Sequence, residues 1–344
     1  MKAIRIHEHG GADMLRYEDV AEPNLLAPTD ALVKLRAASL NRGDLDVRRG
    51  LTGTKLKFPH IPGSDAAGVV IEVGTAVTNV APGDAVCVFP ASGCGHCEFC
   101  ISDNEFLCGQ LNVIGQQEDG TYAGYLRISG RNCFPLPTSL SFEEAAALPL
   151  AYTSAWRMLV TNAELKPGQD VLIRGTDETA IASVLIAVQL GARVFVVSDN
   201  SEKLAKIRAL GAENTIHYSQ TDFAKEVRHR TGKRGVDVVV DCIGGNGWSH
   251  SIASLAKGAR LVTCGANSGS NPPTDLRRIF WNDLKIFGSN LGDRKDFRQM
   301  LNFMQNSRIK PIIDQVLPLR DAAAAQERLE KNEAFGKLVL QIGE

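Results

Sequence analysis

The sequence has no long apolar run and no excess of charge of either sign. No stretch approaches the roughly 18 consecutive apolar residues that a membrane-spanning helix requires, so we expect no membrane partner. Lys and Arg total 38 and Asp and Glu total 39, which leaves no basic surface of the kind that dominates binding to nucleic acid. The first residues alternate like a strand and have no signal or transit character.

What is present is the composition of a globular protein. Hydrophobic residues make up 44% of the 344 residues and charged residues 22%, which excludes disordered, collagen-like and coiled-coil chains. The length suggests two domains, at about 150 residues each. Of the eight cysteines, four lie close together and four, Cys87, Cys133, Cys242 and Cys264, are scattered through apolar stretches. A core of this size needs no disulfides, so we expect reduced thiols and a cytoplasmic protein.

The sequence pattern changes between the first 135 residues and the rest of the chain. The first 135 residues are rich in short β-like runs broken by Gly and Pro, such as 31–35, 68–74 and 84–88, which predicts a barrel-like domain. From Ser141, which can form a capping box with Glu144, helices alternate with apolar strands. The expected strands are 170–174, 193–197, 214–217, 237–242, 260–264 and 285–289, and the helices between them include 180–190 and 202–210.

This alternation predicts a parallel, doubly wound sheet of the Rossmann type. The tail contains an expected helix at 322–331 and a last strand at 337–341, and we expect it to return to the first domain. The predicted class is therefore α/β. A β-barrel domain would comprise residues 1–150 and 292–344, and a Rossmann domain would comprise residues 151–291.

A group of cysteines near residues 90–110 has the spacing of a metal site. Cys94, Cys97, Cys100 and Cys108 follow the pattern C-x2-C-x2-C-x7-C, and zinc binds four thiolates in a tetrahedron at about 2.3 Å. Four unrelated cysteines and an iron–sulfur cluster are the alternatives, but ferredoxin loops end in C-x3-C-P, and neither that gap nor that Pro is found here. Four thiolates leave no open position on the metal, so we expect one structural zinc, with His96 outside its ligand set.

Further motifs extend along the whole chain. They are Gly68-Val69-Val70-Ile71-Glu72-Val73-Gly74, Pro82-Gly83-Asp84, Leu148-Pro149, Lys166-Pro167-Gly168, Asp241-Cys242-Ile243-Gly244-Gly245 and Gly336-Lys337-Leu338-Val339-Leu340. With the cysteine group, they resemble the zinc-containing medium-chain dehydrogenase/reductase superfamily, in its quinone oxidoreductase-like branch. The resemblance implies a GroES-like β-barrel domain with a structural zinc lobe, a Rossmann domain, and an active site in the cleft between them.

The ligands of a second zinc are missing. In alcohol dehydrogenases of this family, a cysteine, a His-Glu pair after a Pro-Gly and a further cysteine or acid hold a catalytic zinc. The corresponding residues here are Asn41, Ser64 with Asp65, and Leu150. Asn, Ser and Leu do not replace Cys, His and Cys around this cation. The resemblance therefore implies that the catalytic zinc is absent.

The zinc-free branch has an early motif, N-x-x-D-x-x-x-R, that Asn41, Asp44 and Arg48 match. A conjugated acceptor needs less help from a Lewis acid, because hydride arrives at a carbon already polarised through the conjugation. The Asn41 amide could then stabilise the developing oxyanion. The resemblance implies an NAD(P)H-dependent reductase of small molecules, either activated double bonds (enone, enal or enoyl thioester) or quinones. Asn41, Asp44 and, as an acid, Tyr152 are the catalytic candidates. The alternatives are that Asn41 and Asp44 form only a turn with an Asx cap, and that the protein is a zinc-independent alcohol or aldehyde oxidoreductase.

The expected nucleotide turn departs from the family. In place of G-x-G-x-x-G, the chain reads Gly175-Thr176-Asp177-Glu178-Thr179-Ala180, and Asp177 stands where the backbone should approach a pyrophosphate. Acidic residues also suit a helix N-terminus for its own stability. A third hypothesis is therefore a non-catalytic member of the fold with a degenerate nucleotide site.

Other cofactor candidates follow the family alignment. They are Gly175, Thr176 and Asp177 at the turn, Asp199, Asn200, Lys203 and Tyr218 near the ribose, and Ser154, Gly265 and Asn290 near the nicotinamide. Lys203 and Tyr218 fall where the quinone-reductase branch contacts a 2′-phosphate, whereas Asp199 could take the ribose hydroxyls of NAD. The pattern favours NADPH over NADH, with Lys203 as an exposed helix lysine the alternative interpretation.

Assembly and substrate have weaker signals. The family pairs Rossmann domains through their sixth strands, and Phe280-Trp281 would suit a homodimer contact, although both could instead fill the core. The substrate pocket of the family is lined by loops such as residues 51–58. Arg49, Lys55 and Lys57 could attract an anionic substrate or simply be solvated.

Overall fold

The structure is a computed structural model that describes residues 1–25, 27–51, 53 and 55–343. The chain divides into two units, one of Met1–Ala151 with Asp293–Glu344 and one of Tyr152–Gly292. Of the expected pocket loop 51–58, residues 52 and 54 lie outside the described residues. Within the described part of the chain, no helix has the length and apolar character needed to cross a membrane.

The first unit is a β domain whose main sheet has the order β16-β17-β3-β4-β5-β9, with β8 also paired to β3. These strands are β3 (Asp30–Ser39), β4 (Asp65–Val73), β5 (Ala85–Val88), β8 (Tyr125–Ser129), β9 (Cys133–Pro135), β16 (Ile313–Pro318) and β17 (Lys337–Gln341). Smaller pairs are β1 (Lys2–Arg5) with β2 (Arg16–Asp19) and β6 (Ala91–Ser92) with β7 (Asn112–Val113). Leu340 of β17 lies opposite Ala38 of β3, so the tail completes the sheet that the first residues begin.

The core of this unit follows the period-two pattern of its strands. Ala31, Val33 and Leu35 of β3 are fully buried, whereas Lys34 and Arg36 between them are partly exposed. Alternate side chains of a strand point to opposite faces of its sheet, so one face of β3 packs against the core.

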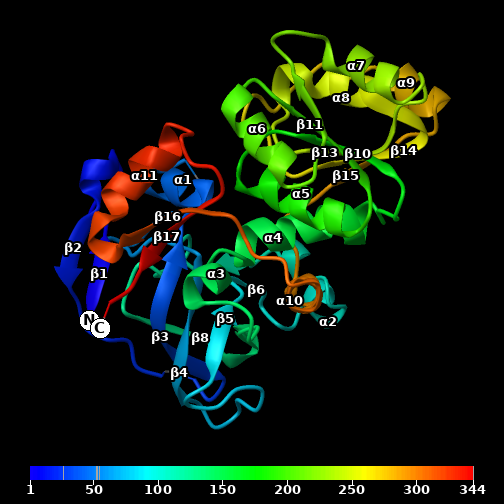
Figure 1. Cartoon of the computed structure of the whole chain (residues 1–344). Coiled ribbons are helices and arrows are strands. Elements are labelled where there is room, and N and C mark those ends of the chain that lie inside the picture. The colour runs from blue at the N-terminus through cyan, green and yellow to red at the C-terminus, as the bar shows by residue number, and fades with distance from the viewer. Residues whose placement is uncertain (26, 52, 54, 344) are drawn as a thin grey trace. The chain divides into compact units, whose positions relative to one another are not determined.

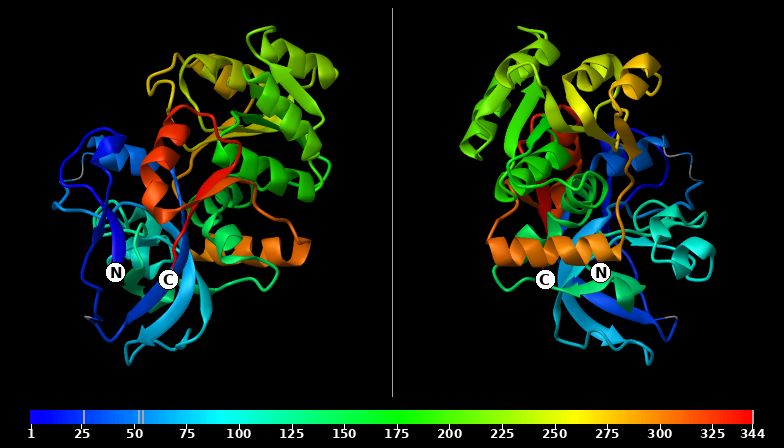
Figure 2. Two further views of the ribbon diagram at one scale, coloured as in Figure 1. Left: turned by 60° about the vertical axis from the view of Figure 1, so that its left-hand side comes forward. Right: turned by 90° about the vertical axis from the view of Figure 1, so that its right-hand side faces the viewer.

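Helices of different lengths flank this sheet. They are α1 (Arg42–Arg49), α2 (Glu98–Ile101), α3 (Phe142–Ala146), α10 (Arg294–Ser307) and α11 (Ala322–Glu330), and α4 (Pro149–Trp156) begins in this unit and ends in the other. The predicted capping box of α3 is confirmed, because Ser141 Oγ accepts from the Glu144 backbone N–H. Figure 1 shows α11 beside α1, far from it in sequence, and Glu330 joins them through ion pairs. Figure 2 shows α10 as a long, straight orange helix.

The second unit is the predicted parallel sheet, with the order β12-β11-β10-β13-β14-β15. The strands are β10 (Asp170–Arg174), β11 (Arg193–Ser198), β12 (Asn214–His217), β13 (Val236–Asp241), β14 (Leu255–Thr263) and β15 (Lys285–Gly288). Helices α5 (Glu178–Gln189), α6 (Ser201–Ala209), α7 (Phe223–Arg230), α8 (Trp248–Ser254) and α9 (Leu276–Trp281) connect them. The strand order reverses between β10 and β13, and open α/β sheets bind ligands at the carboxyl ends of strands at such a point.

One face of this sheet is an apolar layer under two helices. Leu172, Val239 and Leu261 are register partners on neighbouring strands and are fully buried. They belong to the same core cluster as Val227 of α7 and Ile252 of α8. The near-continuous apolar runs of these strands are those of a sheet buried on both faces.

Candidate functional site

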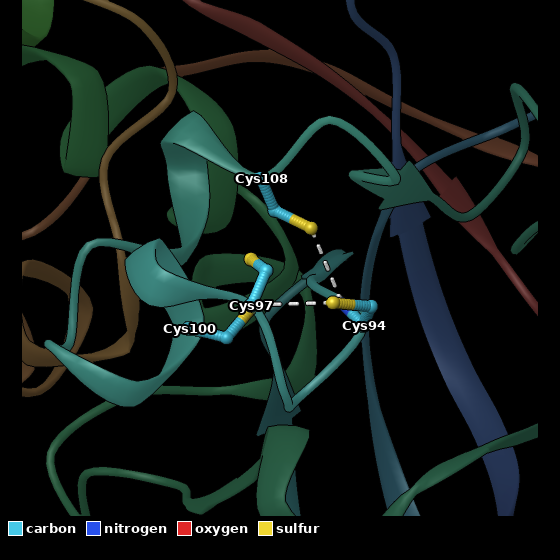
Figure 3. A group of neighbouring side chains, drawn as sticks. All are labelled: Cys94, Cys97, Cys100 and Cys108. Atoms are coloured by element: carbon cyan, nitrogen blue, oxygen red, sulfur yellow. Dashed lines mark hydrogen bonds between the residues drawn. The ribbon is translucent and has the colours of Figure 1, made fainter.

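Four cysteines of the first unit form a compact thiol group. The Sγ atoms of Cys94, Cys97, Cys100 and Cys108 all lie within 4.8 Å of one another, and Figure 3 shows them converging from the loop after β6, from α2 and from the segment before β7. A zinc ion bonded tetrahedrally at about 2.3 Å separates its sulfurs by about 3.8 Å. The Cys94 and Cys100 sulfurs are 3.9 Å apart. The donor set therefore fits a structural zinc, as predicted.

Backbone N–H groups donate to the sulfurs of Cys94 and Cys108. The amide N–H groups of His96 and Cys97 lower the pKa of Cys94 to about 6. Backbone N–H groups of Cys94 and Gln110 donate to Cys108 Sγ at 3.4 and 3.3 Å. The ring of His96 is bonded to a backbone carbonyl and is not part of the thiol group.

A buried lysine contacts two of the residues that stand where alcohol dehydrogenases of the resembled family have ligands of their catalytic zinc. The ammonium of Lys337, in β17, donates to Asn41 Oδ1 at 2.6 Å and to Asp65 Oδ2 at 3.0 Å. The backbone N–H of Leu150 donates to Asp65 Oδ1 at 3.0 Å. Ser64, also at one of those positions, donates its hydroxyl to a backbone carbonyl instead. An ammonium on an amide and a carboxylate is not a zinc-binding donor set.

Asp44 helps to fix Asn41. It is 1% exposed, and its Oδ2 accepts from the Asn41 backbone N–H at 2.9 Å and from the Tyr122 hydroxyl at 2.9 Å. Burial raises the pKa of Asp44 from 3.8 to about 7. The alternative interpretation, a turn with an Asx cap, describes both residues, because Asn41 is the N-cap of α1 and forms a capping box with Asp44. Arg48, the third residue of the motif, is fully buried and paired with Glu330.

The turn after β10 uses its carboxylate as a helix cap. Gly175 has φ +113°, a conformation that favours glycine, and a Cβ there would lie 3.0 Å from Ile243. Asp177 is the N-cap of α5, and its Oδ1 accepts from the Ala180 N–H at 2.9 Å. One of the N–H groups that this helix end offers to a phosphate is thus already bonded. Thr176 is buried, with its hydroxyl 3.4 Å from that of Ser198.

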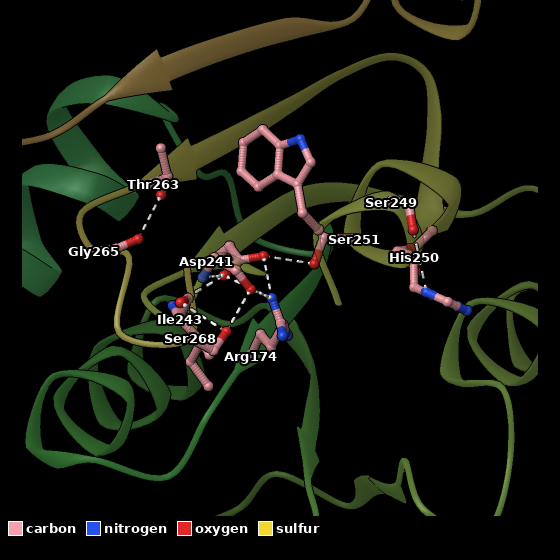
Figure 4. A network of polar contacts seen from close by, with 12 residues as sticks. Arg174, Asp241, Ile243, Ser249, His250, Ser251, Thr263, Gly265 and Ser268 are labelled. Carbon is pink, nitrogen blue, oxygen red and sulfur yellow. Dashed lines mark hydrogen bonds and ion pairs between the residues drawn. The ribbon is translucent and has the colours of Figure 1, made fainter. Parts of the chain in front are cut away.

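A polar network that sequence reasoning missed lies where the strand order reverses (Figure 4). Arg174, at the end of β10, donates to Asp241 at the end of β13 at 3.0 Å and to the Gly244 carbonyl at 2.6 Å. Asp241 is fully buried and also accepts from Ser251 Oγ at 2.7 Å. A sequence signal for this network was present. Arg174 and Asp241 each end an apolar strand, and the strand order of a doubly wound sheet makes these two strands neighbours.

The ribose candidates form two local groups. Tyr218 donates its hydroxyl to Asp199 Oδ2 at 2.7 Å, and this bond raises the pKa of Tyr218. Asn200 is the N-cap of α6 and accepts from the Lys203 backbone N–H at 2.9 Å. Lys203 is only 4% exposed, so the alternative that it is an exposed helix lysine is wrong.

The remaining candidates have mostly structural contacts. Ser154 Oγ lies 3.4 Å from the Leu291 carbonyl, Asn290 Oδ1 accepts from the Leu291 N–H, and a Cβ on Gly265 would lie 2.5 Å from the Cys242 carbonyl oxygen. Tyr152 is 1% exposed, and its role as an acid stays a prediction.

Two cysteines that are scattered in the sequence meet in the second unit. Cys264 Sγ donates to Cys242 Sγ at 3.2 Å, one residue beyond paired positions of β13 and β14. This bond and burial raise the pKa of Cys242, which keeps it a thiol. None of the eight cysteines is in a disulfide.

The cations of the expected substrate loop have different surroundings. Arg49 pairs with Glu330 at 2.8 Å and shares that carboxylate with Arg48. Lys57 lines a cavity of about 580 Å³ in the first unit, together with Arg5 and Arg127.

Models of two protein families match this chain. The model described as alcohol dehydrogenase GroES-like domain matches residues 27–138, and the one described as zinc-binding dehydrogenase matches residues 180–306. A zinc-type alcohol dehydrogenase-like protein of Schizosaccharomyces pombe is 32% identical over 97% of both chains, and a quinone oxidoreductase of Rattus norvegicus is 26% identical over 99% of this chain and 98% of its own. A crystal structure of an NAD-dependent alcohol dehydrogenase is 38% identical over 100% of both chains, with a TM-score of 0.95.

These matches confirm the predicted fold class, a GroES-like domain with a Rossmann-like parallel sheet. Dehydrogenases and an oxidoreductase are among the relatives, as the sequence motifs led us to expect. The chain belongs to the zinc-type medium-chain dehydrogenase/reductase superfamily of oxidoreductases.

Proposed function

We propose that the protein is an NAD(P)H-dependent reductase that transfers hydride to an activated double bond or a quinone without a catalytic zinc. The observation that carries this proposal is the amide of Asn41. Its Oδ1 faces the Lys337 ammonium, and its Nδ2 is buried with no hydrogen-bond partner among the described residues. Burying a donor without a hydrogen-bond partner costs about 1–3 kcal/mol of folding stability. Such a group is therefore expected where a ligand supplies the acceptor.

The chemistry assigned to Asn41 is stabilisation of an oxyanion. Hydride adds to the β-carbon of an enone, the C=C electron pair shifts, and the carbonyl oxygen becomes an enolate oxygen. The Asn41 Nδ2–H would donate to that oxygen without giving up its proton. Protonation of the α-carbon, with water as the final proton source, completes the two-electron reduction. Asp44 contributes by holding the backbone of Asn41.

The dinucleotide, when bound, supplies the hydride. The residues that would hold it are Gly175 and Thr176, with the N-terminal end of α5, and Asp199 for the ribose. The glycine conformation and the free N–H groups of this twelve-residue helix fit a pyrophosphate, although Asp177 occupies one of them.

The form of the dinucleotide is open to a direct test. The preference for NADPH rests on Lys203 and Tyr218, yet Lys203 is buried and Tyr218 is bonded to Asp199. Asp199 is exposed at the end of β11, where a carboxylate would repel a 2′-phosphate and accept from ribose hydroxyls. The arrangement of Asp199, Lys203 and Tyr218 favours NADH. The preference for NADPH stays a prediction from the sequence, and this arrangement does not support it.

Each of the two alternative functions is supported by one observation. The names of the relatives favour an alcohol or aldehyde oxidoreductase, which would here have to work without the usual zinc ligands. The cap made by Asp177 favours a non-catalytic protein with a degenerate nucleotide site.

We also propose a homodimer through α9 and β15. Phe280 and Trp281 are 67% and 79% exposed, so they do not fill the core. Strand β15 ends the sheet, and its outer edge has no partner strand among the described residues. An apolar surface beside an open edge is typical of a sheet that continues into a second copy.

The experiment is an assay of NADH and NADPH oxidation with the zinc-loaded protein. Alkenones, alkenals and benzoquinone are compared with secondary alcohols in the reverse direction, and metal analysis counts zinc. We expect turnover of a conjugated acceptor, one zinc per chain, and a loss of about a hundredfold in kcat for Asn41→Ala. Asn24→Ala, which removes an exposed amide, is the control. Alcohol turnover alone, with Asn41→Ala unaffected, would contradict the proposal.

A further inference from the structure

Lys337 is a charged side chain in the interior of the first unit. It is 2% exposed, and its Nζ lies 2.7 Å from the Leu40 carbonyl, 2.6 Å from Asn41 Oδ1 and 3.0 Å from Asp65 Oδ2. An ammonium has three N–H donors, and three acceptors surround it here. Lys337 therefore has no donor left for a substrate, and any effect on the reaction must pass through its partners.

The lysine fixes which way the Asn41 amide is turned. The oxygen and nitrogen of an amide differ little in shape, so hydrogen bonding decides their assignment. Lysine can only donate, and so the oxygen of the amide must face it. The Nδ2 group is then directed to the other side, where it is buried without a partner among the described residues.

Asp65 keeps the charge of the lysine in place. Its carboxylate is fully buried, and Oδ2 accepts from Ser39 Oγ at 3.1 Å while Oδ1 accepts from the Leu150 N–H at 3.0 Å. A carboxylate held by these donors and an ammonium is a fixed counter-charge. The ion pair in turn makes the bond to Asn41 Oδ1 a charge-assisted one, which is stronger than a bond between neutral groups.

We propose that Lys337 is a positioning residue of the reductase, which orients the Asn41 amide and polarises it as the donor to the oxyanion. Drawing electron density toward Oδ1 strengthens the Nδ2–H as a donor, because linked hydrogen bonds polarise one another. A protein-borne cation thus acts through one amide on the oxygen that a zinc ion would polarise directly in the alcohol dehydrogenases. This inference rests on the proposed function, since it assigns the acceptor of the Asn41 donor.

The test combines kinetics with an oxyanion probe that needs no dinucleotide. Para-nitrophenol bound at the Asn41 donor is expected to shift toward its phenolate form, which absorbance reports at fixed pH. Lys337→Met with Asp65→Asn removes the cation and leaves no unpaired buried charge. We expect this variant to lose the phenolate shift and about a hundredfold in kcat, with KM within about threefold. Lys310→Met, which removes an exposed lysine paired with Glu144, is the matched control.

Folding is checked by the thermal melt and the zinc content of each variant. If the methionine variant does not fold, Lys337→Gln with Asp65→Asn takes its place, because glutamine keeps a neutral donor toward Asn41, and a partial loss of both signals is then expected. A variant that folds and keeps both its kcat and its phenolate shift overturns the inference, even if Asn41→Ala is inactive. A wild-type protein that reduces no acceptor, yet shows a phenolate shift that depends on Lys337, overturns the proposed function and supports the inference.

Discussion

The buried carboxyl of Asp44 makes a prediction about stability that is independent of any activity. The group is 1% exposed and accepts from the Asn41 N–H and the Tyr122 hydroxyl. Burial is the largest cause that raises its pKa from 3.8 to about 7, with Asp65 raising it further and Lys337 lowering it. Asp44→Asn replaces the neutral acid with an uncharged group of similar shape that still offers an oxygen to both donors.

The sign follows from where the proton is bound. Between the two pKa values, the folded chain keeps a proton that the unfolded chain releases, so raising the pH favours unfolding. The stability that Asp44 contributes is fully present below its unfolded pKa near 3.8 and is lost as pH rises through about 7. One pKa unit corresponds to about 1.4 kcal/mol. The free energy of unfolding therefore falls by about this amount for each of the roughly two pH units between pH 5 and pH 7, and by a little more above pH 7. The total change between about pH 5 and about pH 8 is about 2–3 kcal/mol.

The assay is denaturant unfolding of the wild type and of Asp44→Asn at several pH values, kept above pH 5 because acid protonates zinc ligands. The free energy of unfolding of the variant should rise relative to the wild type by about 2–3 kcal/mol over this range. Asp46→Asn, on the same helix but only half-buried, should show no such change. A difference between Asp44→Asn and the wild type that is flat with pH would refute the reasoning.

Three other predictions follow from the sites. Cys100→Ser should lower the zinc content and the free energy of unfolding by at least about 2 kcal/mol, whereas His96→Ala should keep one zinc per chain, as metal analysis and chemical unfolding would report. Asp177→Gly frees the Ala180 N–H and removes a carboxylate, so calorimetry should give about tenfold tighter dinucleotide binding; unchanged affinity would mean that the phosphate lies elsewhere. Trp281→Glu should convert a dimer into a monomer in light scattering, whereas Ile101→Glu, which alters another exposed apolar residue, should not.

Regular patterns made much of the fold predictable. The apolar strands of the second unit, the Ser141 cap and the last strand were identified because each has a local signal of period or capping. Helix α10 was missed although Phe297, Met300, Leu301 and Met304 have helical spacing after the Asp293 cap. Strand β16 was missed for a physical reason, because it is an edge strand that ends in Pro318 and buries little of its apolar surface.

The candidate site was predictable only where its chemistry is local in sequence. The cysteine spacing identified the thiol group because its ligands come from one short segment. Lys337, by contrast, is nearly 300 residues from Asn41, and only the antiparallel pairing of β17 with β3 brings its side chain to that amide. The meeting of Arg174 with Asp241 likewise depends on the order of the strands.

The charges at the nucleotide turn imply an unusual salt dependence. The carboxylates of Asp177, which caps α5, and of the next residue, Glu178, both lie at the end of the helix that a phosphate would approach. A phosphate approaching α5 would therefore gain from backbone N–H groups and the helix dipole, and would lose from repulsion. Salt screens the repulsion between exposed charges more than it weakens bonds to fixed N–H groups. Dinucleotide affinity should then rise, or stay level, as salt is added, and the slope should reverse in Asp177→Gly. A steep fall of affinity with salt in the wild type would mean that cations outside this turn bind the phosphates.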